Sequence, residues 1–280
     1  AGVLLELDEE QMLYALGIAG TQAFGLREMF GTMTKPFHPG KAAQNGLMAA
    51  LLAKQGFTSS TQVLEAKRGF ANVLAPEHDL EQVNIHWGEQ WELLKNTFKP
   101  YACGIVLHPS IDACIALGKQ VQAEAVDYIE VHVNPYVLEL TGKQTPKTGL
   151  EGKFSIYHSG AVGFLYGTAG EAQYSDDVVN HPDVVAFREK IRPIVKEDMK
   201  EEQVYAKLVK NNGEMVEIKV EHATGSYENP LSMEALEEKF TTLTEPMIGL
   251  EQTEKLIQAI KHIEHKPSLD DIFKYAVKHE

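Results

Sequence analysis

The middle of the chain restricts the fold most, because β-type patterns occur there between long stretches of helical pattern. Residues 126–133 alternate apolar and polar side chains, which is the period of a half-buried strand. Two more alternating runs, 204–210 and 215–220, flank Asn211-Asn212-Gly213, a sequence typical of a hairpin turn. These patterns predict a small sheet that includes a β-hairpin.

Apolar residues recur at helical spacing on both sides of this sheet and between its strands. We expect a turn at Pro39-Gly40, just before a helix, and a helix opened by Pro109. The expected helices cover 7–23, 43–56, 60–67, 109–117, 159–166, 182–191, 232–240, 251–262 and a last one near Ser268, with a helix or turn at 87–98. This order predicts an α+β multidomain fold, in which a smaller α+β domain is inserted into a mainly helical one.

The predicted domains are the first part of the helical domain at 1–98, the α+β domain at 99–225, and a return segment of the helical domain at 226–280. A chain of 280 residues is long enough for this division, and its 44% hydrophobic and 24% charged content is ordinary for a soluble globular protein. No apolar run approaches the length of a membrane span, and the first residues lack the basic region of a signal peptide. We therefore expect no membrane association and a cytoplasmic protein.

Charge and cysteine content exclude several classes of partner and cofactor. A net charge of −14 argues against a nucleic-acid-binding surface. Cys103 and Cys114 are the two cysteines, too few for the protein ligands of an iron–sulfur cluster, and no zinc-type spacing is present. We expect both thiols to be free and buried, and we expect neither a metal nor another cofactor.

Residues 35–46 carry a local group of cationic side chains, which is notable in an acidic chain. Lys35, His38 and Lys41 fall within seven residues, just before the expected helix. Helix N-termini offer unpaired N–H groups, so this arrangement suits a small anionic ligand. The alternative is a solvated basic turn at the start of a surface helix.

Four segments in order, spread over nearly the whole chain, together resemble the MmgE/PrpD family: 31–46, 98–113, 153–167 and 225–240. The resemblance implies a helical domain, a smaller α+β lid domain, an active cleft between them, and a homodimer. It also implies one of three activities on small polycarboxylates: dehydration of 2-methylcitrate, decarboxylation of cis-aconitate, or epimerisation of iminodisuccinate. In a eukaryote the mitochondrial matrix is then an alternative compartment.

The family also has helices upstream of the segment that begins at Leu7, and these are expected to be missing here. A fragment, a truncated homologue and one half of a split protein all remain open. In the last case a separate N-terminal chain would be a partner.

Such reactions need cations that hold carboxylates and a group that moves a proton at carbon. By resemblance, Lys35 binds a carboxylate and His38 is a second binder or a proton-transfer group, whereas Lys41 falls where the family varies and is expected to be solvated. Lys99, at the junction of the two predicted domains, is assigned to substrate binding and catalysis. The alternative interpretation is that Lys99 is an exposed linker lysine without a functional role.

Three further side chains are candidates in the α+β domain. His108 either binds substrate in the same cleft or only precedes a helix. His158 stands where some decarboxylases of the family have a tyrosine, and Tyr157 is the shifted alternative. A histidine with a pKa near neutrality would act as acid or base. The alternative for Tyr157 and His158 is a pair of structural side chains.

The sequence thus predicts a metal-free lyase of the MmgE/PrpD type that acts on a small polycarboxylate. The 2-methylcitrate type of dehydration is the first expectation, and decarboxylation or epimerisation is the second. A non-catalytic protein that binds carboxylates or a partner chain is the alternative from another class.

Overall fold

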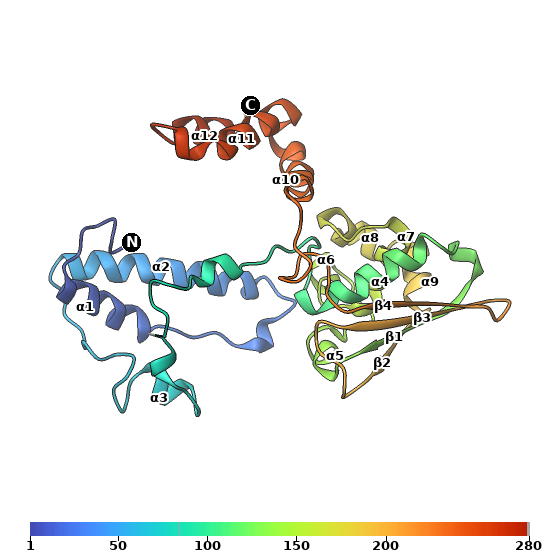
Figure 1. The fold of residues 1–280 in the computed structure, drawn as a ribbon, viewed down its shortest axis with the longest axis horizontal. Helices are drawn as coiled ribbons and strands as arrows, with labels where there is room; N and C mark the ends of the chain where they lie inside the picture. Colours follow the sequence, from blue (N-terminus) through green and yellow to red (C-terminus); the bar gives the residue numbers. More distant parts are fainter. Residues whose placement is uncertain (84, 279–280) are drawn as a thin grey trace. The chain divides into compact units, whose positions relative to one another are not determined.

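The computed structural model describes residues 1–83 and 85–278 of the chain (Figure 1). They form two compact units, residues 1–95 and the residues from Asn96 onward. The predicted division into three segments, with 226–280 returning to the helical domain, stays a prediction.

The first unit is built on two helices that pack together, α1 (Glu9–Gly20) and α2 (Thr34–Lys54). Asp8 caps α1: its carboxylate accepts a hydrogen bond from the backbone N–H of Gln11 at 2.8 Å. The side-chain oxygen of Gln11 in turn accepts one from the backbone N–H of Asp8 at 3.2 Å. The small core between the helices consists of Ala15, Ile18, Ala49, Ala50 and Ala53. The shorter elements are η1 (Arg27–Met29), α3 (Phe70–Leu74), η2 (Leu80–Val83) and η3 (Glu92–Lys95).

Two expectations for this unit are wrong. Pro39-Gly40 does not form a turn, because α2 already begins at Thr34 and contains Pro39. Pro36 falls in the first turn, where a missing N–H costs nothing, so only Pro39 removes a helical hydrogen bond. Residues 61–69 form turns instead of the helix expected at 60–67, and α3 follows them.

The second unit contains a four-stranded sheet in the order β2-β1-β3-β4. Strands β1 (Val126–Val133), β3 (Val204–Lys210) and β4 (Met215–Val220) pair antiparallel and confirm the predicted sheet and hairpin. Gly213 has φ +87° in the hairpin turn, a conformation that favours glycine. Strand β2 (Ile191–Val195) pairs parallel to β1 and was not predicted, because it follows directly on a helical pattern.

Two helices at the centre of this unit pack on each other and on the sheet. Helix α4 (His108–Gly118) contacts β3 and β4, whereas α7 (Ile156–Tyr166) contacts α4, β2 and α9 (Pro182–Arg188). The two helices approach closely at Gly118, where a Cβ atom would lie 2.4 Å from the carbonyl oxygen of Phe164. The remaining elements are η4 (Ile105–Leu107), η5 (Ala123–Ala125), α5 (Pro135–Thr141), α6 (Gly149–Gly152), η6 (Glu171–Tyr174) and α8 (Asp176–Val179).

The chain then continues as helices, as predicted: α10 (Met233–Ile248), α11 (Leu250–Lys261), η7 (Ile263–His265) and α12 (Asp270–Tyr275). Ser232 caps α10 by accepting the N–H of Ala235 at 3.2 Å. Helices together with one small mixed sheet confirm the α+β fold class. Over 1–83 and 85–278, none of the helices is long and apolar enough to cross a membrane.

Candidate functional site

The first group of candidate residues in the second unit lies at the start of α4. His108 is the first residue of this helix, is only 3% exposed, and has no hydrogen-bond partner for its Nε2 atom. Its ring meets the ring of Tyr101 edge-on, with 5.3 Å between the centroids. The hydroxyl of Tyr101 donates to Asp112, whose carboxylate also accepts the N–H of Thr224 at 2.7 Å. Tyr101 is therefore held in place against the imidazole.

Two lysines lie near this imidazole. The ammonium of Lys99 donates to the carbonyl of Cys103 at 3.2 Å, and Lys239 on α10 donates to the carbonyl of Lys99 at 2.8 Å. Burial, and then the charges of Lys99 and Lys239, lower the pKa of His108 from its ordinary 6.5 to about 4. His108 is consequently neutral at neutral pH, although cations surround it.

The second buried histidine, His158, lies in the first turn of α7. It is 0% exposed, and Ser155 caps the helix by accepting its backbone N–H at 3.1 Å. Its Nε2 lies 2.9 Å from the carbonyl oxygen of Gln173, which can only accept, so Nε2 carries the hydrogen. The bare Nδ1 atom is buried and has no partner.

The pKa of His158 does not lie near neutrality. Burial lowers this pKa from 6.5 to about 4; the hydrogen bond to Gln173 opposes the change, and the charge of Arg188 adds to it. The sequence offered no sign that the ring would be withdrawn from water, because burial depends on the packing of α7 against its neighbours.

Polar side chains link His158 to Cys103, whose carbonyl accepts Lys99. The hydroxyl of Tyr174 lies 2.9 Å from the Oγ atom of Ser159 and also interacts with the thiol of Cys103. The ring of Tyr174 meets the ring of His158 at 5.4 Å between centroids. Burial raises the pKa of the Cys103 thiol to about 11, which keeps it protonated. This cysteine and Cys114 are free and buried, as predicted.

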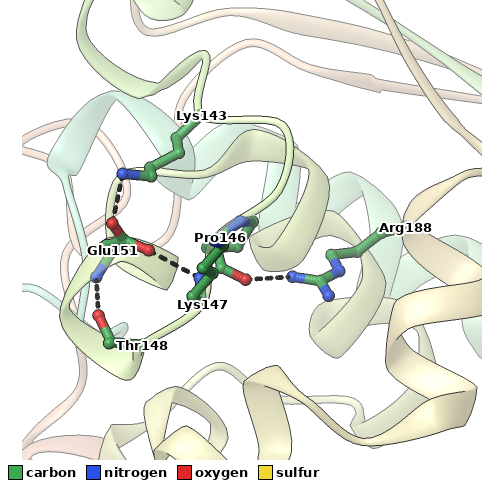
Figure 2. A network of polar contacts seen from close by, with 6 residues as sticks. All are labelled: Lys143, Pro146, Lys147, Thr148, Glu151 and Arg188. Atoms are coloured by element: carbon green, nitrogen blue, oxygen red, sulfur yellow. Dashed lines mark hydrogen bonds and ion pairs between the residues drawn. The ribbon is translucent and has the colours of Figure 1, made fainter.

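Arg188, near His158, holds the loop between α5 and α6 (Figure 2). It is 8% exposed and donates to the carbonyl of Pro146 at 3.3 Å. Glu151 closes the same loop. Its carboxylate accepts a hydrogen bond from the ammonium of Lys143 at 2.5 Å and another from the backbone N–H of Lys147 at 2.7 Å (Figure 2). Arg188 thus adds a buried positive charge beside the second histidine.

The other sequence candidates lie elsewhere. Lys35 and His38 both occupy the start of α2 in the first unit, three residues apart and hence on one side of the helix. A Cβ atom at Gly25 would lie 3.0 Å from Nδ1 of His38, so the backbone there packs on the ring. Lys41 donates to Gln44 at 3.0 Å.

Tyr157 is half-buried and packs against the core of the second unit. Lys99, His108 and His158 thus belong to one unit, and Lys35 and His38 belong to the other.

Four residues of the arrangement were missed by sequence reasoning: Tyr101, Tyr174, Arg188 and Lys239. Tyr174, Arg188 and Lys239 act on the histidines from segments that are distant in sequence, which local patterns do not report. Tyr101 and Lys239 carried a signal, since they belong to the second and fourth segments that resemble the family. Within the described residues, no group of three or more histidine, cysteine, aspartate or glutamate side chains is arranged to hold a metal ion.

Comparison with known proteins agrees with this arrangement of two domains. Residues 1–83 match the MmgE/PrpD N-terminal domain, and residues 101–265 match the MmgE/PrpD C-terminal domain. The chain belongs to the MmgE/PrpD family.

Its curated relatives include a cis-aconitate decarboxylase of Aspergillus terreus (strain NIH 2624 / FGSC A1156), 28% identical over 86% of this chain and 54% of the relative. The human cis-aconitate decarboxylase is 26% identical over 94% of this chain and 57% of the relative. A cis-aconitate decarboxylase-like protein, oryM, of Aspergillus oryzae is 24% identical over 96% of this chain and 60% of the relative. The chain thus spans little more than half the length of these relatives.

Proposed function

We propose that this chain forms part of a lyase that acts on a small polycarboxylate without a bound cofactor. The observation that carries the proposal is a pair of buried, neutral histidines whose ring nitrogens lack partners close to cationic side chains. Buried polar atoms are nearly always hydrogen-bonded, so unsatisfied atoms beside positive charges favour an anionic ligand. A carboxylate would supply the missing negative charge, and it would accept a hydrogen bond from Nδ1 of His158 once that ring has taken up a proton.

Decarboxylation of an unsaturated tricarboxylate is the reaction we favour, because the curated relatives named above are cis-aconitate decarboxylases and a related protein. When carbon dioxide leaves, the electron pair of the broken C–C bond stays on carbon and is delocalised toward a neighbouring carboxylate. Cations at that carboxylate stabilise the charge, and one proton must then be delivered to carbon. In this proposal Lys99 and His108 bind carboxylates.

His158 is the proposed proton-transfer group. A bound polyanion favours the imidazolium form, so it raises the pKa of His158 from about 4 toward neutrality, and the imidazolium gives its proton to carbon. Water then restores that proton. Tyr157 remains the alternative donor, and Lys35 with His38 remain proposed as a second carboxylate-binding and proton-transfer pair.

Dehydration of the 2-methylcitrate type is the second candidate. It needs a base at carbon and an acid at the leaving hydroxyl, and His108 and His158 offer two imidazoles for these roles. Epimerisation and a non-catalytic carboxylate-binding role remain further alternatives. The expected homodimer also stays a proposal, which light scattering of the purified protein tests.

Proton and carbon NMR in D₂O, with a chelator present, distinguishes these reactions. We expect ¹³C-carboxyl-labelled cis-aconitate to release labelled bicarbonate and to gain one deuterium on carbon. Lys99→Gln should lower kcat/KM roughly tenfold or more through loss of a charge-assisted hydrogen bond. The exposed Lys200 provides a matched control, because Lys200→Gln removes the same charge from a side chain that is 73% exposed. Turnover of 2-methylcitrate alone would contradict decarboxylation, and full activity of Lys99→Gln would contradict the site.

A further inference from the structure

Strand β4 is an edge strand, and its outer side pairs with no other strand among the described residues (Figure 1). The backbone N–H of Lys210 donates to the carbonyl of Glu214 at 2.8 Å, which sets the alternation of hydrogen bonds along the β3–β4 hairpin. By this alternation the N–H and C=O groups of Glu217 and Lys219 point outward, away from β3. Such a row of outward-pointing groups is a template for another strand.

The opposite edge of the sheet differs from β4. It is formed by β2, which contains Pro193. A proline on an edge strand lacks the N–H that another chain would need for pairing. Strand β4 has no proline, and its register with β3 contains no shift. The sheet is therefore protected against pairing at one edge and open to it at the other.

The side chains of β4 divide into an apolar row and a charged row. Val216, Ile218 and Val220 are half-buried and pack against the core of the second unit. Glu217 and Lys219 alternate with them and are exposed. Because side chains alternate between the faces of a sheet, one face of this edge is apolar and the other carries one charge of each sign.

The sequence of β4 is self-complementary in one antiparallel register. When Ile218 of one copy lies opposite Ile218 of a second copy, Glu217 lies opposite Lys219 at both symmetric positions. The outward-pointing backbone groups of these two residues then face each other, as a hydrogen-bonded antiparallel pair requires. Val216 lies opposite Val220, so the apolar row continues from one copy to the other.

Neighbouring registers lack this match. A shift of two residues in one direction places Glu217 opposite Glu217 of the second copy, and a shift in the other direction places Lys219 opposite Lys219. Like charges directly opposite each other destabilise a strand pair. A shift of one residue would turn the apolar row to the charged face. One register is therefore strongly preferred.

The partners that the two charged side chains have within the chain leave them able to make this contact. Lys219 pairs with Glu221, but its side chain is 67% exposed, and exposed ion pairs contribute little to stability. Glu217 accepts a hydrogen bond from the hydroxyl of Tyr205. A carboxylate accepts several hydrogen bonds at once, so this one does not prevent contact with a lysine.

We propose that the outer edge of β4 is the docking surface for a second copy of this chain, paired antiparallel about Ile218. The contact is isologous, because the same strand takes part from both copies, and it joins the two four-stranded sheets into one continuous sheet. Only one strand from each copy is involved, so the association is weak and depends on protein concentration. The proposal goes beyond the proposed function and does not rest on it.

An exchange of charges between two variants tests this surface. Glu217→Lys leaves two lysines on the edge, and Lys219→Glu leaves two glutamates, so each variant repels a copy of itself. By sedimentation velocity up to millimolar concentration, we expect each variant to associate roughly ten- to one-hundredfold more weakly than the wild type. An equimolar mixture should associate nearly as the wild type does, because every lysine then faces a glutamate.

The matched control is Lys255→Glu on α11, which changes the net charge as Lys219→Glu does. It should associate as the wild type does. Circular dichroism establishes that each variant is folded before the comparison, and both altered positions of β4 are exposed.

Ile218→Cys tests the register directly. In a non-hydrogen-bonded antiparallel pair the two Cα atoms lie about 4.5 Å apart, within the range of a disulfide. Mild oxidation should therefore link two copies of this variant. The wild type should not be linked under the same conditions, because Cys103 and Cys114 are buried.

Several results would overturn the proposal. They are a wild-type protein that stays monomeric at millimolar concentration, folded charge variants that associate as the wild type does, and a mixture that associates no better than its components. A folded Ile218→Cys variant that associates without forming the cross-link would overturn the register.

Discussion

Lowering the pH from 7 to 5 should destabilise the second unit through its two buried histidines. The pKa values of His108 and His158 are about 4 in the folded protein, against an ordinary 6.5 in an unfolded chain. Between these two pKa values the histidines are protonated in the unfolded chain but neutral in the folded protein. The stability contributed by the neutral rings is therefore complete above pH 6.5 and is lost as the pH falls toward 4.

The size of the effect follows from the same pKa values. A difference of about 2.5 between the folded and unfolded pKa corresponds to roughly 3 kcal/mol for each histidine when the pH has fallen below 4. By pH 5 the loss relative to pH 7 is about 2 kcal/mol for each ring. Together the two losses reach about 4 kcal/mol, a large part of the roughly 5–15 kcal/mol that stabilises a typical domain.

The loss can be measured by urea unfolding at both pH values, with the NMR signals of ¹³C-labelled histidine rings as the probe. The rings of His108 and His158 report on unfolding of the second unit. Tryptophan fluorescence would not, because Trp87 and Trp91 are the two tryptophans and both belong to the first unit. His108→Gln and His158→Gln should each remove about half of the pH dependence. His181→Gln is the control, since that ring is half exposed.

Two results would refute the reasoning. One is a ring of His108 or His158 that titrates near pH 6.5 in the folded protein. The other is a folded His158→Gln variant that keeps the full pH dependence of the wild type.

Three further predictions concern packing, capping and thiol reactivity. Gly149→Ala should lower the free energy of unfolding in urea by about 3 kcal/mol or more, because the new Cβ atom would lie 1.7 Å from a backbone carbonyl oxygen. Gly40→Ala is the control. A Cβ atom there meets open space, so this variant should be neutral or stabilising. Ser155→Ala should cost about 1 kcal/mol by the same assay through loss of the α7 cap, and an unchanged midpoint would contradict that role. Cys103 and Cys114 should react with iodoacetamide only after unfolding, because burial raises their thiol pKa values to about 11 and 12; mass spectrometry of rapid modification in the native state would show the opposite.

Much of the fold could be predicted because its signals are local. The alternation in 126–133 and the turn at Asn211-Asn212-Gly213 correspond to β1 and to the β3–β4 hairpin. The serine cap before α10 was also recognised. The failures occur where local signals conflict with context. Pro39 suggests a break, yet α2 continues through it, and β2 is too short and too close to a helix to be separated from it.

The candidate site divides in the same way. The sequence by itself determined the family, and with it the candidates Lys35, His38, Lys99, His108 and His158, because these side chains stand in short segments that can be read in order. Tertiary structure alone decided that the pKa values of His108 and His158 are lowered by burial. The pKa of His158 depends on its withdrawal from water, and the surroundings of His108 depend on Lys239, which is more than a hundred residues away in the chain. Burial and electrostatic interaction depend on distances in space, and a linear pattern does not contain those distances.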